Sequence, residues 1–219
     1  MAPTWLTVVA CTYLATCFGC AAVIAFDIFV AGRRQPMGVM NAVFPITALY
    51  FGPLALAFYW RWGRPPVTGR PWWAMMATEV SHCGSGCVLG DVISEFAIFG
   101  LALTIAGATW GAEYVGDYVL ALAFGIVFQY FAIAPMRGLG LADGLKAAAK
   151  ADFISLTFFE VGLFGWMAIF MFVLFPAPHQ LMPDSAAYWL LMQIGMVIGY
   201  ATSWPANVWL VSRGIKIPM

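Results

Sequence analysis

Charge is scarce in this sequence. Asp, Glu, Lys and Arg make up 9% of the 219 residues, whereas 63% are hydrophobic, and a typical soluble domain carries about 25% charged residues. The ten basic and ten acidic side chains give no net charge, so there is no electrostatic basis for binding nucleic acid. The composition predicts an integral membrane protein in contact with the lipid bilayer.

Common enzyme motifs are missing as well. The sequence contains no Walker loop, dinucleotide-binding fingerprint, HExxH motif or nucleophile elbow. Its two histidines are few for a haem with two histidine ligands. These absences argue against an enzyme built on one of those motifs, and they direct attention to polar residues inside the apolar runs.

Long apolar runs occupy most of the chain. A helix needs about 20 apolar residues to cross a bilayer, and six segments meet this length. We therefore expect an all-α polytopic membrane protein, a bundle of about six transmembrane helices that forms one domain over residues 1–219. The expected spans are approximately residues 5–29, 38–60, 82–108, 112–134, 152–175 and 187–211.

The basic residues predict the orientation of these spans. With a cytoplasmic N-terminus, eight of the ten basic residues fall on the cytoplasmic side, which agrees with the positive-inside rule. We therefore expect both termini in the cytoplasm and location in a bacterial inner membrane. Arg33 and Arg34 are left outside, and they would fit better if the first span were re-entrant or the chain inverted. Residues 71–80 and 140–152 are expected to lie along the inner interface, before spans three and five.

A row of polar residues runs along the third expected span. Glu79, Cys83, Cys87, Asp91 and Glu95 recur at four-residue intervals, so the middle members share one helix face. An acid in the hydrocarbon region is costly unless it is paired or hydrated. Asp91 and Glu95 should therefore face the bundle interior, and so should the two cysteines.

Other expected spans supply possible neighbours. Glu160 in span five lies about as deep as Asp91, about 12 Å from the inner end. Cys17 and Cys20 share a face of span one, and Tyr50 lies between two prolines of span two. No Lys or Arg lies inside a span to neutralise the acids, so these are either protonated and hydrogen-bonded to one another or arranged around a cation.

Three sequence blocks resemble a known family. "VMNAVFPITALYFGPLALAFYWRWGR", "HCGSGCVLGDVISEF" and "ADFISLTFFEVGLFGWM" are similar to blocks of a bacterial integral-membrane family catalogued only as a domain of unknown function. The resemblance runs from about residue 37 to residue 175, and the HCxxxCxxxD pattern is its most specific part. It implies a helical membrane fold and no activity. Span one and its cysteines lie outside it.

The residues of that pattern predict a soft-metal site. Thiolate and imidazole ligands suit copper(I) or zinc, so we expect His82, Cys83, Cys87 and Asp91 to be metal ligands. A disulfide is harder, because Cβ atoms one helical turn apart are about 5–6 Å distant and a disulfide prefers about 3.5–4.5 Å. The alternative is that the cysteines are small packing residues of membrane helices.

Two classes of function follow from these patterns. The first is a membrane protein that handles or transports a soft metal ion, copper above all, with Cys83 and Cys87 at the entry and the acids as a proton or cation path. The second is an accessory or assembly subunit of a larger membrane complex, or a homo-oligomer, in which the polar layer is structural. A membrane thiol oxidoreductase is a third, weaker hypothesis.

Overall fold

A computed structural model describes residues 2–217, and within this range the protein is all-α, as the sequence predicts. Seven α-helices and two short π-helical segments make up the fold, and no strand occurs among the described residues. The elements are α1 (Thr4–Phe29), α2 (Met40–Phe51), α3 (Pro53–Phe58), η1 (Tyr59–Gly63), α4 (Trp72–Leu101), α5 (Thr109–Arg137), α6 (Leu141–Ile169), η2 (Phe170–Leu174) and α7 (Ala186–Ser212).

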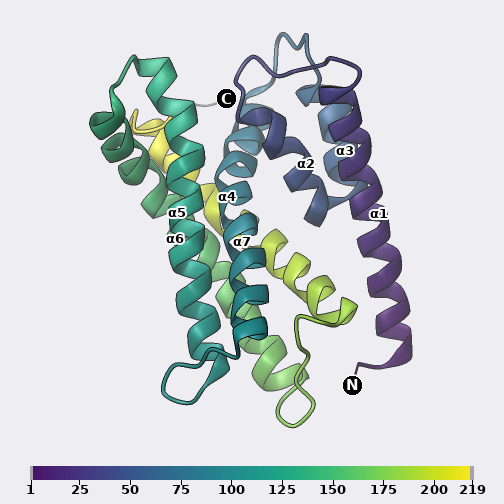
Figure 1. The fold of residues 1–219 in the computed structure, drawn as a ribbon. Coiled ribbons are helices and arrows are strands. Elements are labelled where there is room, and N and C mark those ends of the chain that lie inside the picture. Colours follow the sequence, from purple (N-terminus) through teal and green to yellow (C-terminus); the bar gives the residue numbers. More distant parts are fainter. Residues whose placement is uncertain (1, 218–219) are drawn as a thin grey trace.

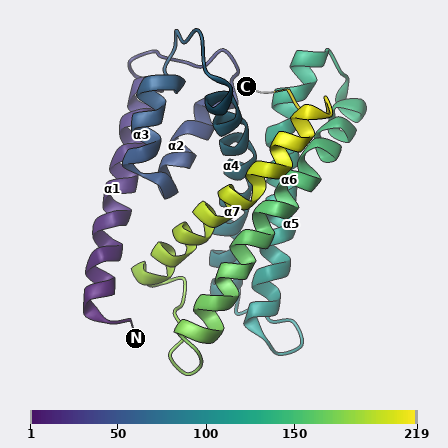
Figure 2. The same cartoon turned by 180° about the vertical axis from the view of Figure 1, so that it is seen from behind.

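The long helices run between two ends of an elongated bundle (Figure 1). We call the end that carries the α1–α2, η1–α4 and α5–α6 connections, together with the residues after α7, the basic end. The α4–α5 and η2–α7 connections and the start of α1 lie at the opposite end. Figure 2 shows α7 crossing the bundle obliquely from the opposite end to the basic end.

The segment from α2 to η1 is a hairpin that enters from the basic end and returns to it. Gly52, with φ of 52°, separates α2 from α3, and Pro53 begins the second arm. A β-carbon on Gly52 would lie 3.0 Å from Cys17 Sγ in the middle of α1, so the hairpin tip reaches only half-way along the bundle. At its base, the Gln35 side-chain amide donates to the Gly63 carbonyl at 3.1 Å.

This hairpin corrects the expectation of a single second span at residues 38–60. Four described helical segments are long and apolar enough to cross a membrane: Thr4–Phe29, Trp72–Leu101, Thr109–Arg137 and Leu141–Leu174. The expected count of about six is therefore not reached by this measure. Because the hairpin does not cross the bundle, the start of α1 and the end of α7 lie at opposite ends of it (Figure 1).

Two helices begin earlier than the expected spans. Residues 71–80 and 140–152 were expected along the membrane surface, but most of each segment forms the first turns of α4 and of α6. The third expected span, 82–108, corresponds to α4, which begins at Trp72. The fifth, 152–175, corresponds to α6 and η2, and α6 begins at Leu141. The first and fourth spans agree with α1 and α5 to within a few residues.

Small residues let α4 and α5 approach closely. A β-carbon on Gly86 would lie 2.7 Å from the Cα of Gly125, and one on Gly90 would collide with the backbone of Ala121. Glycine at such a crossing lets two backbones meet where the membrane provides no hydrophobic force between helices. The close approach brings the polar faces of the two helices together in the bundle interior.

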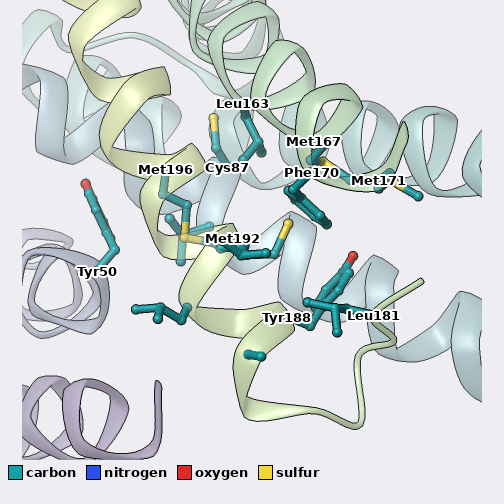
Figure 3. Packing of buried hydrophobic residues seen from close by; sticks show 14 of the residues in the cluster. Tyr50, Cys87, Leu163, Met167, Phe170, Met171, Leu181, Tyr188, Met192 and Met196 are labelled. Carbon is teal, nitrogen blue, oxygen red and sulfur yellow. The ribbon is translucent and has the colours of Figure 1, made fainter. Parts of the chain in front are cut away.

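An apolar core fills the bundle beside these polar faces. Figure 3 shows Leu163, Met167 and Phe170 of the α6–η2 segment against Met192 and Met196 of α7. Unbranched methionines adapt to irregular gaps between oblique helices, which suits the slanted path of α7. The core thus fixes α6 against α7 and leaves the polar side chains to the interface with α4 and α5.

Candidate functional site: a buried row of acids

Most of the acids lie inside the protein. Eight of the ten Asp and Glu side chains are buried, whereas Lys216 is the single buried Lys or Arg among the described residues. Only Asp143 and Asp184 are exposed acids. The buried acids are Asp27, Glu79, Asp91, Glu95, Glu113, Asp117, Asp152 and Glu160. The interior therefore carries an excess of carboxyl groups.

Helix α4 carries the central row of this site. The five residues that the sequence places at four-residue intervals are at most 1% exposed. From Glu79 to Glu95 the row covers about 24 Å of helix at 1.5 Å per residue, which is most of the depth of a bilayer core of about 30 Å. It starts near the basic end and finishes near the opposite end. The row contains Glu79, Cys83, Cys87, Asp91 and Glu95.

Acids from two further helices face the second half of the row. Asp91 has the carboxyls of Glu160, Asp117 and Glu95 within electrostatic range, and Glu113 lies near Glu95. Carboxyl oxygens of all five have no hydrogen-bond partner within the described part of the chain. We call these five residues of α4, α5 and α6 the acid layer.

A different cluster lies at the basic end. The Lys216 ammonium follows α7 and points inward, with Nζ 3.2 Å from Glu79 Oε1. It donates to Asn207 Oδ1 at 2.8 Å and to Ser155 Oγ at 3.0 Å. All four side chains belong to buried residues. The segment after α7 therefore closes this end of the row with a positive charge.

Cys83 joins this cluster to the row. Its Sγ lies 2.9 Å from Ser155 Oγ and donates to Asp152 Oδ1 at 3.3 Å. Cys87 lies one turn further along α4, within electrostatic range of Cys83, Glu160 and Asp91. The two thiols thus connect the basic-end cluster to the acid layer.

Charge holds Lys216 in its protonated form. Burial alone would lower the pKa of this side chain, but Glu79, Cys83 and Asp152 outweigh burial and raise the Lys216 pKa above the ordinary lysine value. The ammonium is therefore a fixed positive charge over the physiological pH range.

His82 does not join the cysteines. Its ring lies 6.1 Å from the ring of Phe128 on α5, and both ring nitrogens lack a hydrogen-bond partner among the described residues. Consecutive helix residues point about 100° apart, which separates His82 from Cys83. In the described part of the chain no three His, Cys, Asp or Glu side chains are placed to hold a metal ion. The structure thus places Cys83, Cys87 and Asp91 along one face of α4, whereas the buried imidazole of His82 lies against Phe128 of α5.

The remaining predicted residues lie at the hairpin tip. Cys17 is buried against Gly52, and Cys20 packs one turn away among apolar residues of α1 and α2. Tyr50 is fully buried, with its side chain within electrostatic range of Cys83 and Cys87. Cys17 and Cys20 therefore belong to the packing of α1 on the hairpin, whereas Tyr50 reaches toward the row.

Sequence reasoning missed four members of the site. Glu113 and Asp117 lie four residues apart inside the expected span 112–134, so the rule that intramembrane acids face inward applied to them too. Asp152 opens the fifth expected span. Lys216 carried no sequence signal beyond its charge, and its pairing with Glu79 corrects the expectation that no Lys or Arg neutralises these acids.

Comparison with known proteins identifies a family. A domain of unknown function, DUF4396, matches residues 72–216. This range covers α4 to Lys216, and hence the whole row, the acid layer and the basic-end cluster, while α1 and the hairpin lie outside it. No curated protein and no solved structure matched the chain. The chain belongs to the DUF4396 family of proteins of unknown function.

Proposed function

We propose that this protein conducts protons, or a cation exchanged for protons, across a membrane through the interior of α4–α7. The observation that carries the proposal is the acid layer: five buried carboxyl side chains from three helices, with unpartnered oxygens and within electrostatic range of one another. A charged acid at the bilayer centre costs about 2.5–3.5 kcal/mol on insertion scales. Five such residues in one protein need a functional reason.

The arrangement suits proton transfer because neighbouring carboxyls cannot all be ionised. Like charges in a low-dielectric interior favour shared protons. Asp91, Glu95 and Asp117 lie close enough to interact electrostatically, so a proton that leaves one carboxyl has an acceptor beside it. The row on α4 extends this set of titratable groups through Cys87 and Cys83 toward the basic end.

The basic residues support an orientation for the bundle. All ten Lys and Arg residues lie in η1, in the connections at the basic end, in the last turn of α5, in the first three turns of α6 or after α7. By the positive-inside rule this end faces the cytoplasm, in a bacterial inner membrane. The N-terminal end of α1 is then outside, the end of α7 is inside, and α7 is a fifth crossing. The hairpin is re-entrant from the cytoplasmic side.

The hairpin supports a transport role. Irregular backbone at membrane depth is tolerated where protein covers it, and broken helices near the midplane are a feature of transporters. Here Tyr13 donates its hydroxyl to the Tyr50 carbonyl at 3.0 Å, and the Gln193 amide donates to the Leu49 carbonyl. These bonds satisfy the carbonyls at the tip and hold it against α1 and α7.

A soft metal is the second candidate for the cargo. Cys83 and Cys87 lie between Asp152 and Glu160, so copper(I) or zinc entering the row would meet two thiols before the acid layer. Elemental analysis after loading with copper(I), on the wild type and on a Cys83→Ser, Cys87→Ser variant, separates this cargo from protons. Bound copper that the double variant loses would favour the metal.

Flux measurements test the proposal directly. The purified protein is reconstituted into vesicles that contain a pH-sensitive dye, and a potassium gradient with valinomycin imposes an inside-negative potential. We expect internal acidification that Asp91→Asn and Glu160→Gln abolish. Asp143→Asn removes an exposed acid of α6 and should leave the rate unchanged. Wild-type vesicles that acidify no faster than empty ones, with or without copper, would favour the accessory-subunit hypothesis.

A further inference from the structure

We infer that the cluster at the basic end is a binding site for a monovalent cation of ammonium size, and that Lys216 is its tethered occupant. This inference rests on the proposed function, because it makes the cluster the cytoplasmic entry to the row of acids. Nothing in the family match assigns a ligand to these residues.

The site is built as a cation site. The Lys216 ammonium donates to Asn207 Oδ1 at 2.8 Å and to Ser155 Oγ at 3.0 Å, and it forms an ion pair with Glu79 Oε1 at 3.2 Å. The oxygens come from three different helices, α7, α6 and α4. A free cation in the place of Nζ would meet the same three oxygens.

The distances select the class of cation. Zinc and magnesium bind oxygen at about 2.0–2.2 Å, and calcium at about 2.3–2.6 Å. The oxygens around Nζ lie further out, at 2.8 Å or more, so a small divalent ion would not reach all three. Ammonium, or a monovalent metal ion of similar size such as potassium, matches these distances and takes the position of Nζ only once the Lys216 side chain has left it.

Unpartnered oxygens point to a ligand independently of Lys216. Glu79 Oε2 and Asp152 Oδ2 are buried and have no hydrogen-bond partner in the described residues, and both residues are 0% exposed. Glu79 pairs with the Lys216 ammonium, and Asp152 lies within electrostatic range of it. If Lys216 leaves, both carboxyls lose their counter-charge inside the protein, which is costly unless another cation arrives.

Short-range backbone bonds to the end of α7 and the Arg137 side chain hold the segment that carries Lys216. It turns at Gly214, where φ is 67°, and the amide of Ile215 donates to the Leu210 carbonyl at 3.0 Å. The exposed Arg137 side chain holds the carbonyl of Ile215 at 3.2 Å. A cation can replace the ammonium when these contacts open, and the row then connects to the cytoplasm.

Chemical rescue tests the site. Lys216→Ala removes the three outer carbons and the nitrogen of the side chain, which together have the shape of n-propylammonium. We expect the variant in detergent to melt several degrees lower than the wild type, and to regain part of this loss in n-propylammonium or ammonium chloride. N-methylglucamine chloride at equal ionic strength should restore nothing. Adding Glu79→Gln should remove the rescue, and the exposed-site variant Lys146→Ala should melt like the wild type.

A second measurement uses the unmodified protein, in case Lys216→Ala does not fold. Acetylation followed by mass spectrometry should modify Lys216 more slowly than Lys146 and Lys150, and potassium chloride should speed modification of Lys216 alone relative to N-methylglucamine chloride. Equal effects of the two salts on both assays would overturn the inference. Neither assay measures flux, so a failure here is distinguishable from a failure of proton conduction.

Discussion

Arg64 and Asp27 form an ion pair, with Nε 2.9 Å from Oδ2, that joins the end of the hairpin to the end of α1. Tyr59 donates its hydroxyl to the same carboxylate oxygen at 2.7 Å. Since Asp27 ends the first crossing and Arg64 follows η1, the pair requires both ends of the hairpin to lie at the basic end. This ion pair fixes the end of the hairpin beside the end of α1, so that α2 and α3 enter the bundle and return to the basic end.

We predict that replacing Arg64 and replacing Asp27 lower the stability of the protein by different amounts. The Asp27 side chain is 7% exposed and that of Arg64 is 32% exposed. Arg64→Met leaves the buried Asp27 carboxylate without its ion partner and should lower the melting temperature. Asp27→Asn leaves an arginine that can reach water and should cost less. Thermal melting of both variants, with the exposed Arg34→Met as control, measures the order; the reverse order would contradict this account.

The hairpin also predicts a labelling pattern. Single cysteines introduced at Arg34 and Pro66 should react with a membrane-impermeant maleimide from the same side, because the segment between them returns to its starting end. Cysteines at Thr104 and Gln180 should react from the other side. All four positions are exposed, and the unsubstituted protein gives the background. Opposite labelling of positions 34 and 66 would restore the six-span arrangement.

The sequence predicted the long helices better than the path of the chain. Residues 5–29 and 112–134 agree with α1 and α5 because length and apolar content are sufficient signals for a simple crossing. Residues 38–60 are equally apolar, yet they turn back at Gly52-Pro53. Gly-Pro is a known breaker of helices, but a glycine–proline pair does not tell whether the chain kinks or reverses. That choice depends on contacts such as Cys17 with Gly52.

The candidate site was predictable only where one helix carries it. The four-residue spacing of Cys83, Cys87 and Asp91 placed them on a shared face from sequence alone. Glu113 and Asp117 are also four residues apart, so the sequence predicts that they share one face of their helix as well. Lys216 was not, because its pairing with Glu79 depends on a fold that brings the end of α7 to the start of α4.

Close packing of α4 on α5 gives a third prediction. Gly90→Ala places a methyl group against the backbone of Ala121, whereas nothing lies within 4 Å of a β-carbon on Gly100. Overpacking costs about 1–3 kcal/mol, so Gly90→Ala should lower the melting temperature and separate the acids of the two helices. Gly100→Ala, in the same helix, should be neutral or slightly stabilising. If both variants melt alike, the close approach at Gly90 is not essential.

The buried lysine gives a prediction about pH. Lys216→Met should cost about 3–5 kcal/mol, the usual effect of removing one partner of a buried ion pair. Glu79, Cys83 and Asp152 raise the Lys216 pKa above the ordinary lysine value. A raised lysine pKa adds stability that is fully present below the unfolded-state pKa, about 10.4, and is lost as the pH rises through the folded-state pKa.

The part of the stability difference between wild type and Lys216→Met that comes from the lysine should therefore be lost only in strong alkali, as the pH rises past the unfolded-state pKa of about 10.4. Melting curves of both proteins from neutral pH to strong alkali measure the difference, and Lys146→Met, at an exposed site, controls for general effects of alkali. Titrating groups far from Lys216 cancel because the two proteins share them, whereas Glu79 and Asp152 interact with the Lys216 charge, so the comparison is made in alkali, where both carboxyls titrate little. A difference that already disappears near neutral pH would mean that Lys216 is not held as a buried cation, and it would remove the occupant from the proposed cation site.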